Sequence, residues 1–485
     1  MSIVCAVWRI GLWIFKLKTA RERANNFGGI YVRIAPLSML LLILGTLCFL
    51  VTGPYRAWHW SYDFVSVYCG SRCLLYGCNP YDMAAVEQQY TLSGGTDPHF
   101  HSQAWRHSQP PVYPPSTFVA MIPFALLELP AAQDLWIVIN TLILVAAVFY
   151  FISSVSDSYR WLANLFGAFF LGISPGTLHW GNPALLAISL LILSCSLYRR
   201  ERMPVLAAGL LCVSLALKPQ IGGLVALFLL AEKAHRRSAA AAIATAVALL
   251  LIGAATLQSR PQSEHWLTDM RTNAVDSFLP GHVNDPASPF GFEVNIESAV
   301  VAVSPGPMIT KIVTYGFLVI LAASLGYCIA KFRPSFGLNG LLLGSIVVFS
   351  IIAVYHRRFD MPLLFLTLPS LIGIFAWRQI VGVTALALTL LAGFPVESLI
   401  NPWLMTHHPA ILQSILDHKV LFLLLLRQQN LALIVLFCLY LAAIYSTGIR
   451  HPKSSDNHEL FIGRVRRGHP AMELSDSYFV ARRIS

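Results

Sequence analysis

Long apolar runs constrain this chain more than any other feature of its sequence. Hydrophobic residues make up 56% of its 485 residues and charged residues only 12%. Several runs approach the roughly 20 residues that a helix needs to cross a bilayer. The sequence therefore predicts an all-α polytopic membrane protein with its core in lipid. The apolar segments are 35–51, 114–128, 133–153, 161–175, 182–198, 203–232, 238–257, 309–331, 337–354, 361–376, 378–393 and 431–447.

The charge of the chain, +11 overall, is concentrated at its ends. Residues 1–33 hold six Lys or Arg against one acidic residue, and residues 448–485 hold seven against four. Because basic residues beside membrane spans mark the cytoplasmic side, both ends are predicted to be cytoplasmic, with no nucleic-acid partner. The basic residues before the first span lead into a full crossing, so no cleavable signal peptide is expected.

This topology divides the chain into three parts. Residues 1–34 form a basic cytoplasmic segment, 35–447 a transmembrane domain, and 448–485 a basic cytoplasmic tail. The two large outer loops are 53–113 and 258–308. With 203–232 counted as two halves there are thirteen apolar segments, and an odd number cannot join two cytoplasmic ends. We therefore expect about 12 crossings, with either 114–128 or 161–175 failing to cross fully.

Asp63 is the ionisable residue that most requires an explanation. It follows the first span closely and is flanked by aromatic residues. A carboxylate with a pKa near 3.9 is ionised at neutral pH and can accept a proton from a hydroxyl. Aspartate also caps helices well, and a helix through Val65 to Leu75 could follow it. The residues alone leave both roles open.

The first outer loop also holds cysteines and histidines that could bind metal or form a disulfide. Cys69, Cys73 and Cys78 contain no Cys-x-x-Cys pair, so zinc is not expected. Packing is favoured over a disulfide, which would require an oxidising compartment. His99-x-His101 could bind metal, but exposed loop histidines are more often solvated. No metal or cofactor is predicted.

The apolar run 203–232 is interrupted by Lys218-Pro219-Gln220. Each half has about 14 residues, or roughly 21 Å of helix, against a hydrocarbon core of about 30 Å. Since proline blocks a continuous helix and basic residues flank both outer ends, two short helices should rise from the cytoplasmic side and meet at Lys218. A lysine at that depth is costly unless it pairs with an anion or reaches water. The alternative is that it snorkels to the interface.

The predicted topology places the chain's isolated polar groups at one leaflet. Asp63, the Tyr113-Pro-Pro turn, His179 with Asn182, Lys218, and His356–Asp360 all face outward. Ionisable groups at membrane depth are tolerated where they line a cavity. A carboxylate and cations in a cavity open to lipid indicate a lipid-phosphate ligand. A base that activates a hydroxyl, opposite a cation that stabilises a departing phosphate, is the minimum needed for glycosyl transfer.

These residues resemble the landmarks of glycosyltransferase family 87. Asp63-Phe64, with Tyr68, Gly70, Gly77 and Asn79-Pro80-Tyr81, is similar to the family's DF-x3-Y…G-x-x-PY signature. Its later landmarks follow in the same order: Tyr113-Pro-Pro115, Gly181-Asn182, Leu217-Lys218-Pro219-Gln220 and His356-x3-Asp360. The resemblance covers 35–376 and is best in the first loop. Asn182 departs from the pattern, because glutamine is more frequent there.

The resemblance implies a GT-C fold and inverting transfer on the extracytoplasmic face of a bacterial plasma membrane. The donor would be a polyprenyl-phosphate sugar, commonly mannose, and the acceptor an envelope glycolipid or polysaccharide. Asp63 would be the base, and the donor phosphate would be bound by Lys218, His356, Arg357 and Arg358. The substrate pocket would include Tyr68, Tyr81, Tyr113, His179, Asn182, Gln220 and Asp360.

Two other classes of protein remain to be weighed. A lipid-linked sugar flippase or anion transporter also builds anion sites from broken helices. No inverted internal repeat is evident, and the two large outer loops favour an enzyme that handles an acceptor outside. A purely structural scaffold would not need ionisable groups gathered at one leaflet.

Overall fold

The structure is a computed structural model that describes residues 27–101, 111–279, 282, 284–286, 288, 293–304, 306–332, 340–394 and 406–450. The predictions for the basic termini lie largely outside these residues, as do those for the side chains of His99 and His101. The described residues are mostly helical, and their only β-type pairing is an isolated bridge between Glu293 and Arg357. An all-α architecture is therefore observed.

The helices of the N-terminal half are α2 (Phe27–Trp60), α3 (Tyr62–Tyr76), α4 (Met83–Leu92), η2 (Pro98–His101), α6 (Pro115–Ala120), α7 (Ile122–Ala125), α8 (Leu129–Ile152), α9 (Asp157–Ile173), α10 (Pro175–Trp180), α11 (Ala184–Arg199) and α12 (Pro204–Leu217). Those of the C-terminal half are α13 (Pro219–Ala231), α14 (Arg236–Gln258), η3 (Pro261–Ser263), α15 (Trp266–Asp276), α16 (Ile296–Val301), α17 (Pro307–Phe332), α18 (Leu341–Ala353), η4 (Arg358–Thr367), α19 (Leu368–Trp377), α20 (Gln379–Gly393), α22 (Pro409–Asp417), α23 (Lys419–Leu426) and α24 (Gln428–Arg450).

Seven helical segments among the described residues are long and apolar enough to cross a membrane. They are Ile34–Trp58, Leu129–Ile152, Asp157–Trp180, Arg236–Gln258, Pro307–Phe332, Arg358–Trp377 and Gln428–Thr447. Five shorter apolar helices, α11, α12, α13, α18 and α20, fall within the other predicted segments. The chain is thus a polytopic membrane protein, as its composition predicts.

The predicted apolar segment 114–128 does not form a full-length membrane span. It folds into α6 and α7, which have six and four residues. Ten helical residues reach roughly 15 Å, about half of the hydrocarbon core. Pro123 lacks an N–H, so α6 cannot continue through it. The competing segment, 161–175, lies inside the long candidate span Asp157–Trp180.

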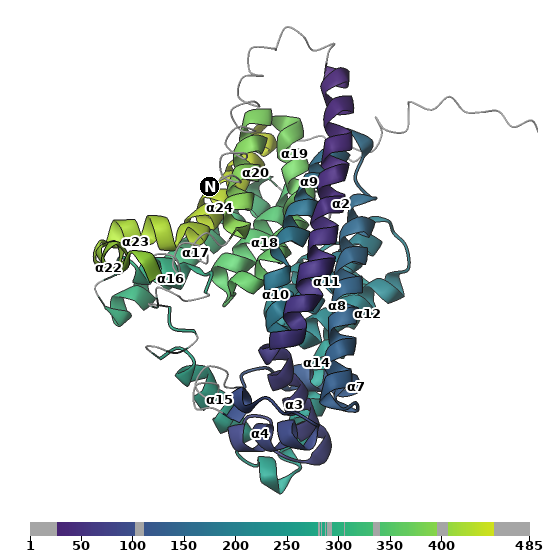
Figure 1. Cartoon of the computed structure of the whole chain (residues 1–485). Helices are drawn as coiled ribbons and strands as arrows, with labels where there is room; N and C mark the ends of the chain where they lie inside the picture. Colours follow the sequence, from purple (N-terminus) through teal and green to yellow (C-terminus); the bar gives the residue numbers. More distant parts are fainter. Residues whose placement is uncertain are drawn as a thin grey trace, which may run out of the picture.

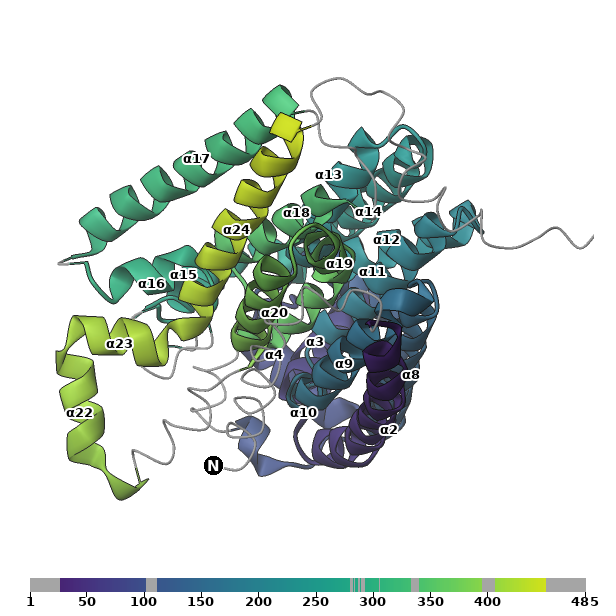
Figure 2. The same cartoon turned by 90° about the horizontal axis from the view of Figure 1, so that it is seen from above.

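The helices form an elongated bundle with a helical tier at one end. α2 packs along α9 and α10, and α11 packs against α8 and α12 inside the bundle (Figure 1). Helices α3, α4 and α15 form the tier at the bottom of that view. Seen from above, α17 lies at the edge of the bundle beside α24 (Figure 2). In the segment 395–430, where the sequence predicts no span, α22 and α23 meet at 112°.

Helix α2 continues beyond its predicted end at residue 51. Its last turns are anchored on α8, where Trp58 Nε1 donates to Asp134 Oδ1 (2.6 Å) and Gln133 Nε2 donates to Trp58 O (3.3 Å). The predicted outer loop, 53–113, therefore begins as helix. Because α3 starts two residues after α2 ends, Asp63 is held between two helices.

The break at Lys218 occurs where the sequence predicts it. Lys218 has φ −155° and ψ 84°, and it separates α12 from α13. The last carbonyls of α12 are satisfied from α6: Ser116 Oγ donates to Ala216 O (3.0 Å) and Thr117 Oγ1 to Leu217 O (2.9 Å). The segment 114–128 thus supports the broken helix pair from the side.

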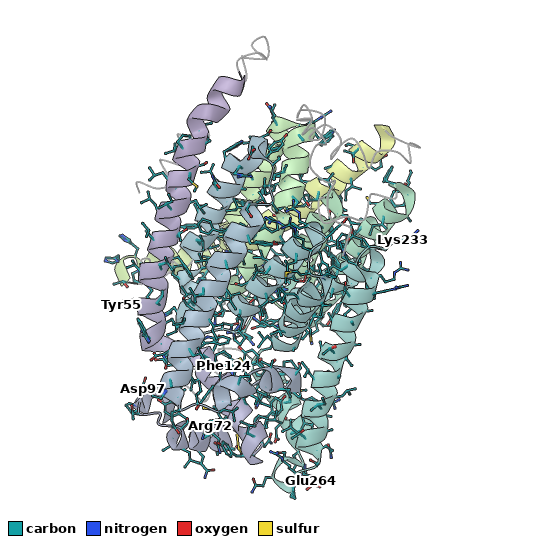
Figure 3. The ribbon with its side chains drawn as sticks, turned by 90° about the vertical axis from the view of Figure 1, so that its right-hand side faces the viewer. Tyr55, Arg72, Asp97, Phe124, Lys233 and Glu264 are labelled. Carbon is teal, nitrogen blue, oxygen red and sulfur yellow. A yellow bond between two sulfur atoms is a disulfide. The ribbon has the colours of Figure 1, made fainter. Side chains whose placement is uncertain are left out.

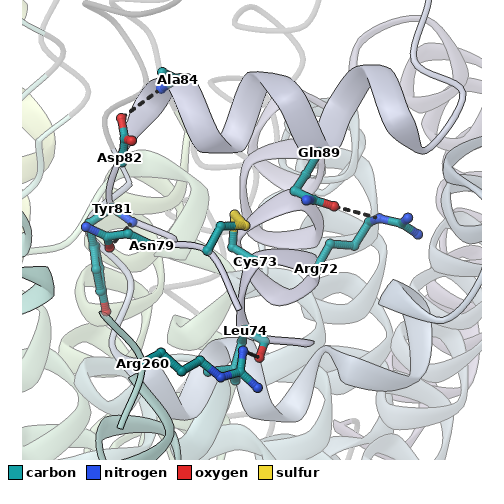
Figure 4. The surroundings of a disulfide bond; sticks show 10 residues. Arg72, Cys73, Leu74, Asn79, Tyr81, Asp82, Ala84, Gln89 and Arg260 are labelled. Atoms are coloured by element: carbon teal, nitrogen blue, oxygen red, sulfur yellow. Dashed lines mark hydrogen bonds between the residues drawn. A yellow bond between two sulfur atoms is a disulfide. The ribbon is translucent and has the colours of Figure 1, made fainter. Parts of the chain in front are cut away.

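The prediction that the loop cysteines would only pack is wrong for one pair. Cys73 and Cys78 form a disulfide, with their Cα atoms 4.5 Å apart, whereas Cys69 is free and buried (Figure 4). Helix α3 ends at Gly77 in the left-handed conformation, φ +96°. That turn brings Cys78 back against the last turn of α3.

Candidate active site

Asp63 lies in the first turn of α3 and is only 3% exposed. The N-cap position belongs to Ser61, so the capping interpretation of Asp63 is wrong. Its Oδ2 accepts a short hydrogen bond, 2.5 Å, from Asn182 Nδ2. Oδ1 accepts no hydrogen bond from the residues that the structure describes. One carboxylate oxygen is held in place and the other is left for a ligand.

Burial raises the pKa of Asp63 above its ordinary value. The charge of Arg357, the hydrogen bond from Asn182 and the charge of Lys218 each act in the opposite direction. A carboxylate whose pKa is raised binds a proton more tightly than one in water. Its neighbouring cations still favour the ionised form, so the group combines basicity with a fixed orientation.

Asn182 connects Asp63 to the broken helix. Its Oδ1 accepts from Ala184 N (2.9 Å) and from Lys218 Nζ (3.3 Å), which fixes the amide with Nδ2 toward Asp63. Gly181 precedes it with φ +67°, a conformation that glycine adopts without strain. A Cβ at position 181 would lie 2.8 Å from Phe64 Cβ, so glycine also allows the end of α10 to approach α3.

Lys218 is buried and paired, so the snorkelling interpretation is wrong. Its Nζ donates to Asp360 Oδ1 at 2.7 Å, and its side chain is 5% exposed. Asp360 is fully buried, and its Oδ2 accepts from His356 Nδ1 (3.0 Å) and from Arg357 N (3.1 Å). Hydrogen bonds therefore run from Asp63 through Asn182, Lys218 and Asp360 to His356.

His356 has one ring nitrogen without a partner. The ring is fully buried, and Nε2 finds no hydrogen bond among the described residues. Since Asp360 accepts at Nδ1, that nitrogen carries the proton, and in the neutral ring Nε2 is an acceptor. The backbone around it is fixed, because Val294 N donates to His356 O (2.8 Å). An unpartnered buried nitrogen is a place where a ligand could bind.

The side chain of Arg357 contacts no carboxylate directly among the residues that the structure describes, so its charge is not offset by an ion pair there. Its Nε donates to Tyr355 OH (2.5 Å) and its Nη2 to Asn284 Oδ1. Burial acts to lower its pKa, but the interactions with Tyr355, Asp63 and Tyr113 together outweigh burial, and the pKa lies above its usual value. The guanidinium is therefore charged and close enough to Asp63 for their charges to interact.

Glu293 is a site residue that the sequence did not identify. It is buried, forms the isolated bridge with Arg357, and has an Oε1 without a partner among the described residues. Burial raises its pKa to about 8, although Arg357 opposes the shift. Nothing in its sequence neighbourhood distinguishes it from the other acidic residues of the second outer loop.

Two of the predicted pocket tyrosines have structural partners, and a third lies at the site. Tyr68 OH donates to Leu127 O (2.6 Å), and Tyr81 OH donates to Tyr113 O (2.7 Å). The pKa of Tyr113 is raised by burial and then by the charge of Asp63, which places its hydroxyl near that carboxylate.

The remaining predicted residues lie outside the chain of hydrogen bonds. His179 contacts Arg56 O through Nδ1 (3.2 Å) and packs beside Trp60 and Trp180. The backbone oxygen of Gln220 accepts from Ser350. Arg358 begins η4, the short helix that carries Asp360.

The charges of Asp63, Asp360, Lys218 and Arg357 balance, so the site holds two carboxylates against two cations. Among the described residues, no group of three or more His, Cys, Asp or Glu side chains is arranged to hold a metal ion. The site offers an oriented carboxylate oxygen, a charged guanidinium and an unpartnered imidazole nitrogen. That set can accept a proton and stabilise an anion.

Residues 112–350 match the model of glycosyltransferase family 87. No curated protein and no solved structure matches the chain. The matched range includes Tyr113, Asn182 and Lys218, but it excludes Asp63 and the segment His356–Asp360. The family inferred from the sequence is confirmed over a narrower range than 35–376.

Proposed function

Because the chain belongs to glycosyltransferase family 87, we propose that it is an integral-membrane inverting transferase that uses a polyprenyl-phosphate sugar, with mannose as the expected sugar. The acceptor is a hydroxyl of an envelope glycolipid or polysaccharide. The family assigns the class of enzyme, and the donor, acceptor and membrane face are our proposals. The main observation that supports the proposed reaction is the hydrogen-bond network that joins Asp63 to Asp360 through Asn182 and Lys218.

We place this site on the extracytoplasmic side of a bacterial plasma membrane. The basic ends of the sequence support this orientation, and the Cys73–Cys78 disulfide is compatible with an oxidising compartment. The five shorter apolar helices are proposed to cross as well, which gives about 12 crossings in a GT-C arrangement. Short helices can meet at a polar site within the membrane because the surrounding protein satisfies their ends.

In the proposed reaction, Asp63 Oδ1 accepts the proton of the acceptor hydroxyl while that oxygen attacks the anomeric carbon. The step is concerted, because a carboxylate is too weak a base to ionise an alcohol beforehand. The new C–O bond forms on one face as the bond to the donor phosphate breaks on the other. The configuration is inverted, and the polyprenyl phosphate leaves with the bonding electrons.

Among the proposed phosphate contacts, Arg357 is the strongest candidate for binding the donor phosphate. Its charge has no direct carboxylate partner in the described site, whereas the charge of Lys218 is shared with Asp360. Lys218 retains a third N–H after its bonds to Asp360 and Asn182, and His356 Nε2 becomes a donor when the ring is protonated. Arg358 completes the set of proposed phosphate contacts.

Transfer from labelled donors tests this function. Membranes containing the protein are incubated with labelled polyprenyl-phosphate mannose or arabinose and with envelope lipids, and the products are identified. We expect a glycosidic product and free polyprenyl phosphate, with an Asp63→Asn preparation as the matched control. If reconstituted protein instead moves intact lipid-linked sugar between leaflets and forms no glycosidic product, the flippase interpretation replaces this one.

A further inference from the structure

A polar cavity of about 510 Å³ lies in the tier of helices at the bottom of the bundle, separate from the Asp63 network. It is formed where the turn after α3 meets η3 and α15 (Figure 4 shows Asn79, Tyr81 and Asp82 of this turn). The lining residues are Asn79, Tyr81, Asp82, Met83, Pro261, Gln262, Glu264, His265, Asp269, Thr272 and Asn273. The two outer loops thus contribute one wall each.

The wall of the cavity is fixed by hydrogen bonds between these loops. Buried Asn79 donates to Asp269 Oδ2 (2.6 Å) and accepts from Tyr81 N (3.0 Å). Asn273 Nδ2 donates to Tyr81 O (2.9 Å) and to Pro111 O (3.1 Å). The cavity is therefore preorganised, which reduces the entropy that a ligand must lose on binding.

The chemistry of the lining selects the class of ligand. Three carboxylates, Asp82, Glu264 and Asp269, line the cavity, and no Lys or Arg does. This charge disfavours a phosphate. Carboxylates, side-chain amides and a hydroxyl are the groups that pair with vicinal hydroxyls. The volume falls within the range of small-molecule pockets, about 300–1,000 Å³. A neutral, hydroxyl-rich ligand fits these properties.

The cavity is linked to the Asp63 site through one side chain. Tyr81, whose backbone is held by Asn273, donates its hydroxyl to Tyr113 O, and Tyr113 lies near Asp63. We propose that this cavity binds a neutral sugar unit of the acceptor and so holds the acceptor beside the base. Its identification as an acceptor subsite rests on the proposed function, whereas saccharide binding by the cavity does not.

Thiol protection tests the binding itself. Thr272→Cys places an exposed thiol on the cavity lining, and its labelling in the purified full-length protein is compared with that of unmodified protein. Mannotriose or maltotriose at millimolar concentration should slow the labelling, and inorganic phosphate should not. In a Glu264→Gln/Asp269→Asn background, about tenfold more saccharide should be required, because hydrogen bonds to a charged carboxylate are stronger than those to a neutral amide. Glu128→Gln, outside the cavity, should change nothing.

The outcomes separate the two proposals. If neither saccharide protects the thiol, or if Ca²⁺ protects it instead, the saccharide site is refuted whether or not the protein transfers sugar. If saccharide protects but no transfer occurs from any donor, the proposed function fails and the site stands. If both hold, the double variant should raise the acceptor KM about tenfold and leave kcat and the donor KM unchanged.

Discussion

One carboxylate oxygen of Asp63 accepts a hydrogen bond from Asn182, and the other has no hydrogen-bond partner in the described structure. Asp63→Asn preserves the shape and removes the proton acceptor. Because general-base assistance is worth ~10² to 10⁴ in rate, turnover should fall at least about a hundredfold with protein abundance unchanged. Initial rates with labelled donor measure this. Asp63→Glu should also be impaired, since the base must reach one oxygen in one geometry. Near-wild-type activity of Asp63→Asn would remove it from the mechanism.

The pair formed by Lys218 and Asp360 should behave as a unit. Lys218→Met or Asp360→Asn leaves a buried charge without its partner, which typically costs about 3–5 kcal/mol. Each single variant should therefore lower the melting temperature in detergent, and the double variant should recover most of the loss.

Activity should follow a different pattern from stability in this series. All variants that lack Lys218 should show weakened donor binding and slow transfer, even where stability is restored. Activity restored together with stability in the double variant would mean that Lys218 only supports the fold.

Glu293 should make stability fall as the pH rises. Its pKa is about 8 in the folded protein against an ordinary value of about 4.5. Below about pH 4.5 the group is protonated in both states, and its contribution is fully present. Between the two values only the unfolded chain loses the proton, so the contribution is lost progressively. Glutamine stays neutral at every pH, so the wild-type fall in melting temperature between about pH 5 and 8 should be absent in Glu293→Gln. The difference between the melting temperatures of the two proteins should therefore change progressively over this range and be constant above about pH 8. An equal fall in both proteins would contradict this.

The sequence alone identifies ionisable residues that would be energetically unfavourable in the membrane without a partner. Asp63, Lys218 and Asp360 are ionisable groups near apolar segments, and such groups require partners. Their partners are less accessible to sequence reasoning, because Lys218 and Asp360 are 142 positions apart. Glu293 and Asn284 lie in a loop with several polar residues, and only the tertiary contact with Arg357 distinguishes them.

At the scale of elements, the local sequence predicts where a helix is interrupted better than it predicts where a helix ends. Pro219 predicts the division between α12 and α13, and the structure has it at Lys218. The extension of α2 to Trp60 depends on bonds to α8, which no local pattern encodes. The division of 114–128 into α6 and α7 agrees with Pro123, whereas the length of the apolar run alone did not distinguish this segment from 161–175.

The close approach of α10 to α3 can be tested at Gly181. Gly181→Ala adds a Cβ 2.8 Å from Phe64 Cβ at a position with φ +67°. The left-handed conformation alone costs roughly 1 kcal/mol, and the contact should displace the start of α3, which carries Asp63. We expect a lower melting temperature and at least a tenfold loss of turnover, as expected for a misplaced catalytic group.

Gly176→Ala is the matched control for this variant. Gly176 lies in the same short helix, α10, and an added Cβ there would meet nothing within 4 Å. It should retain wild-type stability and turnover. Equal losses of stability and turnover in both variants would show that α10 tolerates no alanine. The explanation of Gly181 by its close contact with Phe64 would then be wrong.

At the scale of the whole molecule, α14 connects two exposed positions that should lie on opposite sides of the membrane. Lys233, labelled at the right of Figure 3, precedes this helix, and Glu264, labelled at the bottom, follows it. In intact cells, a membrane-impermeant thiol reagent should label Glu264→Cys and leave Lys233→Cys unlabelled until the membrane is opened. Protein without the added cysteines gives the background. External labelling of Lys233→Cys alone would reverse the proposed orientation.

The buried contact between Lys218 and Asp360 has an evolutionary consequence. A lineage that replaces either residue first passes through a protein with an uncompensated charge in its interior, and most such intermediates will be eliminated by selection. Positions 218 and 360 should therefore be inherited as a pair across related sequences and change together where they change. A family alignment in which the two positions vary independently would contradict this expectation.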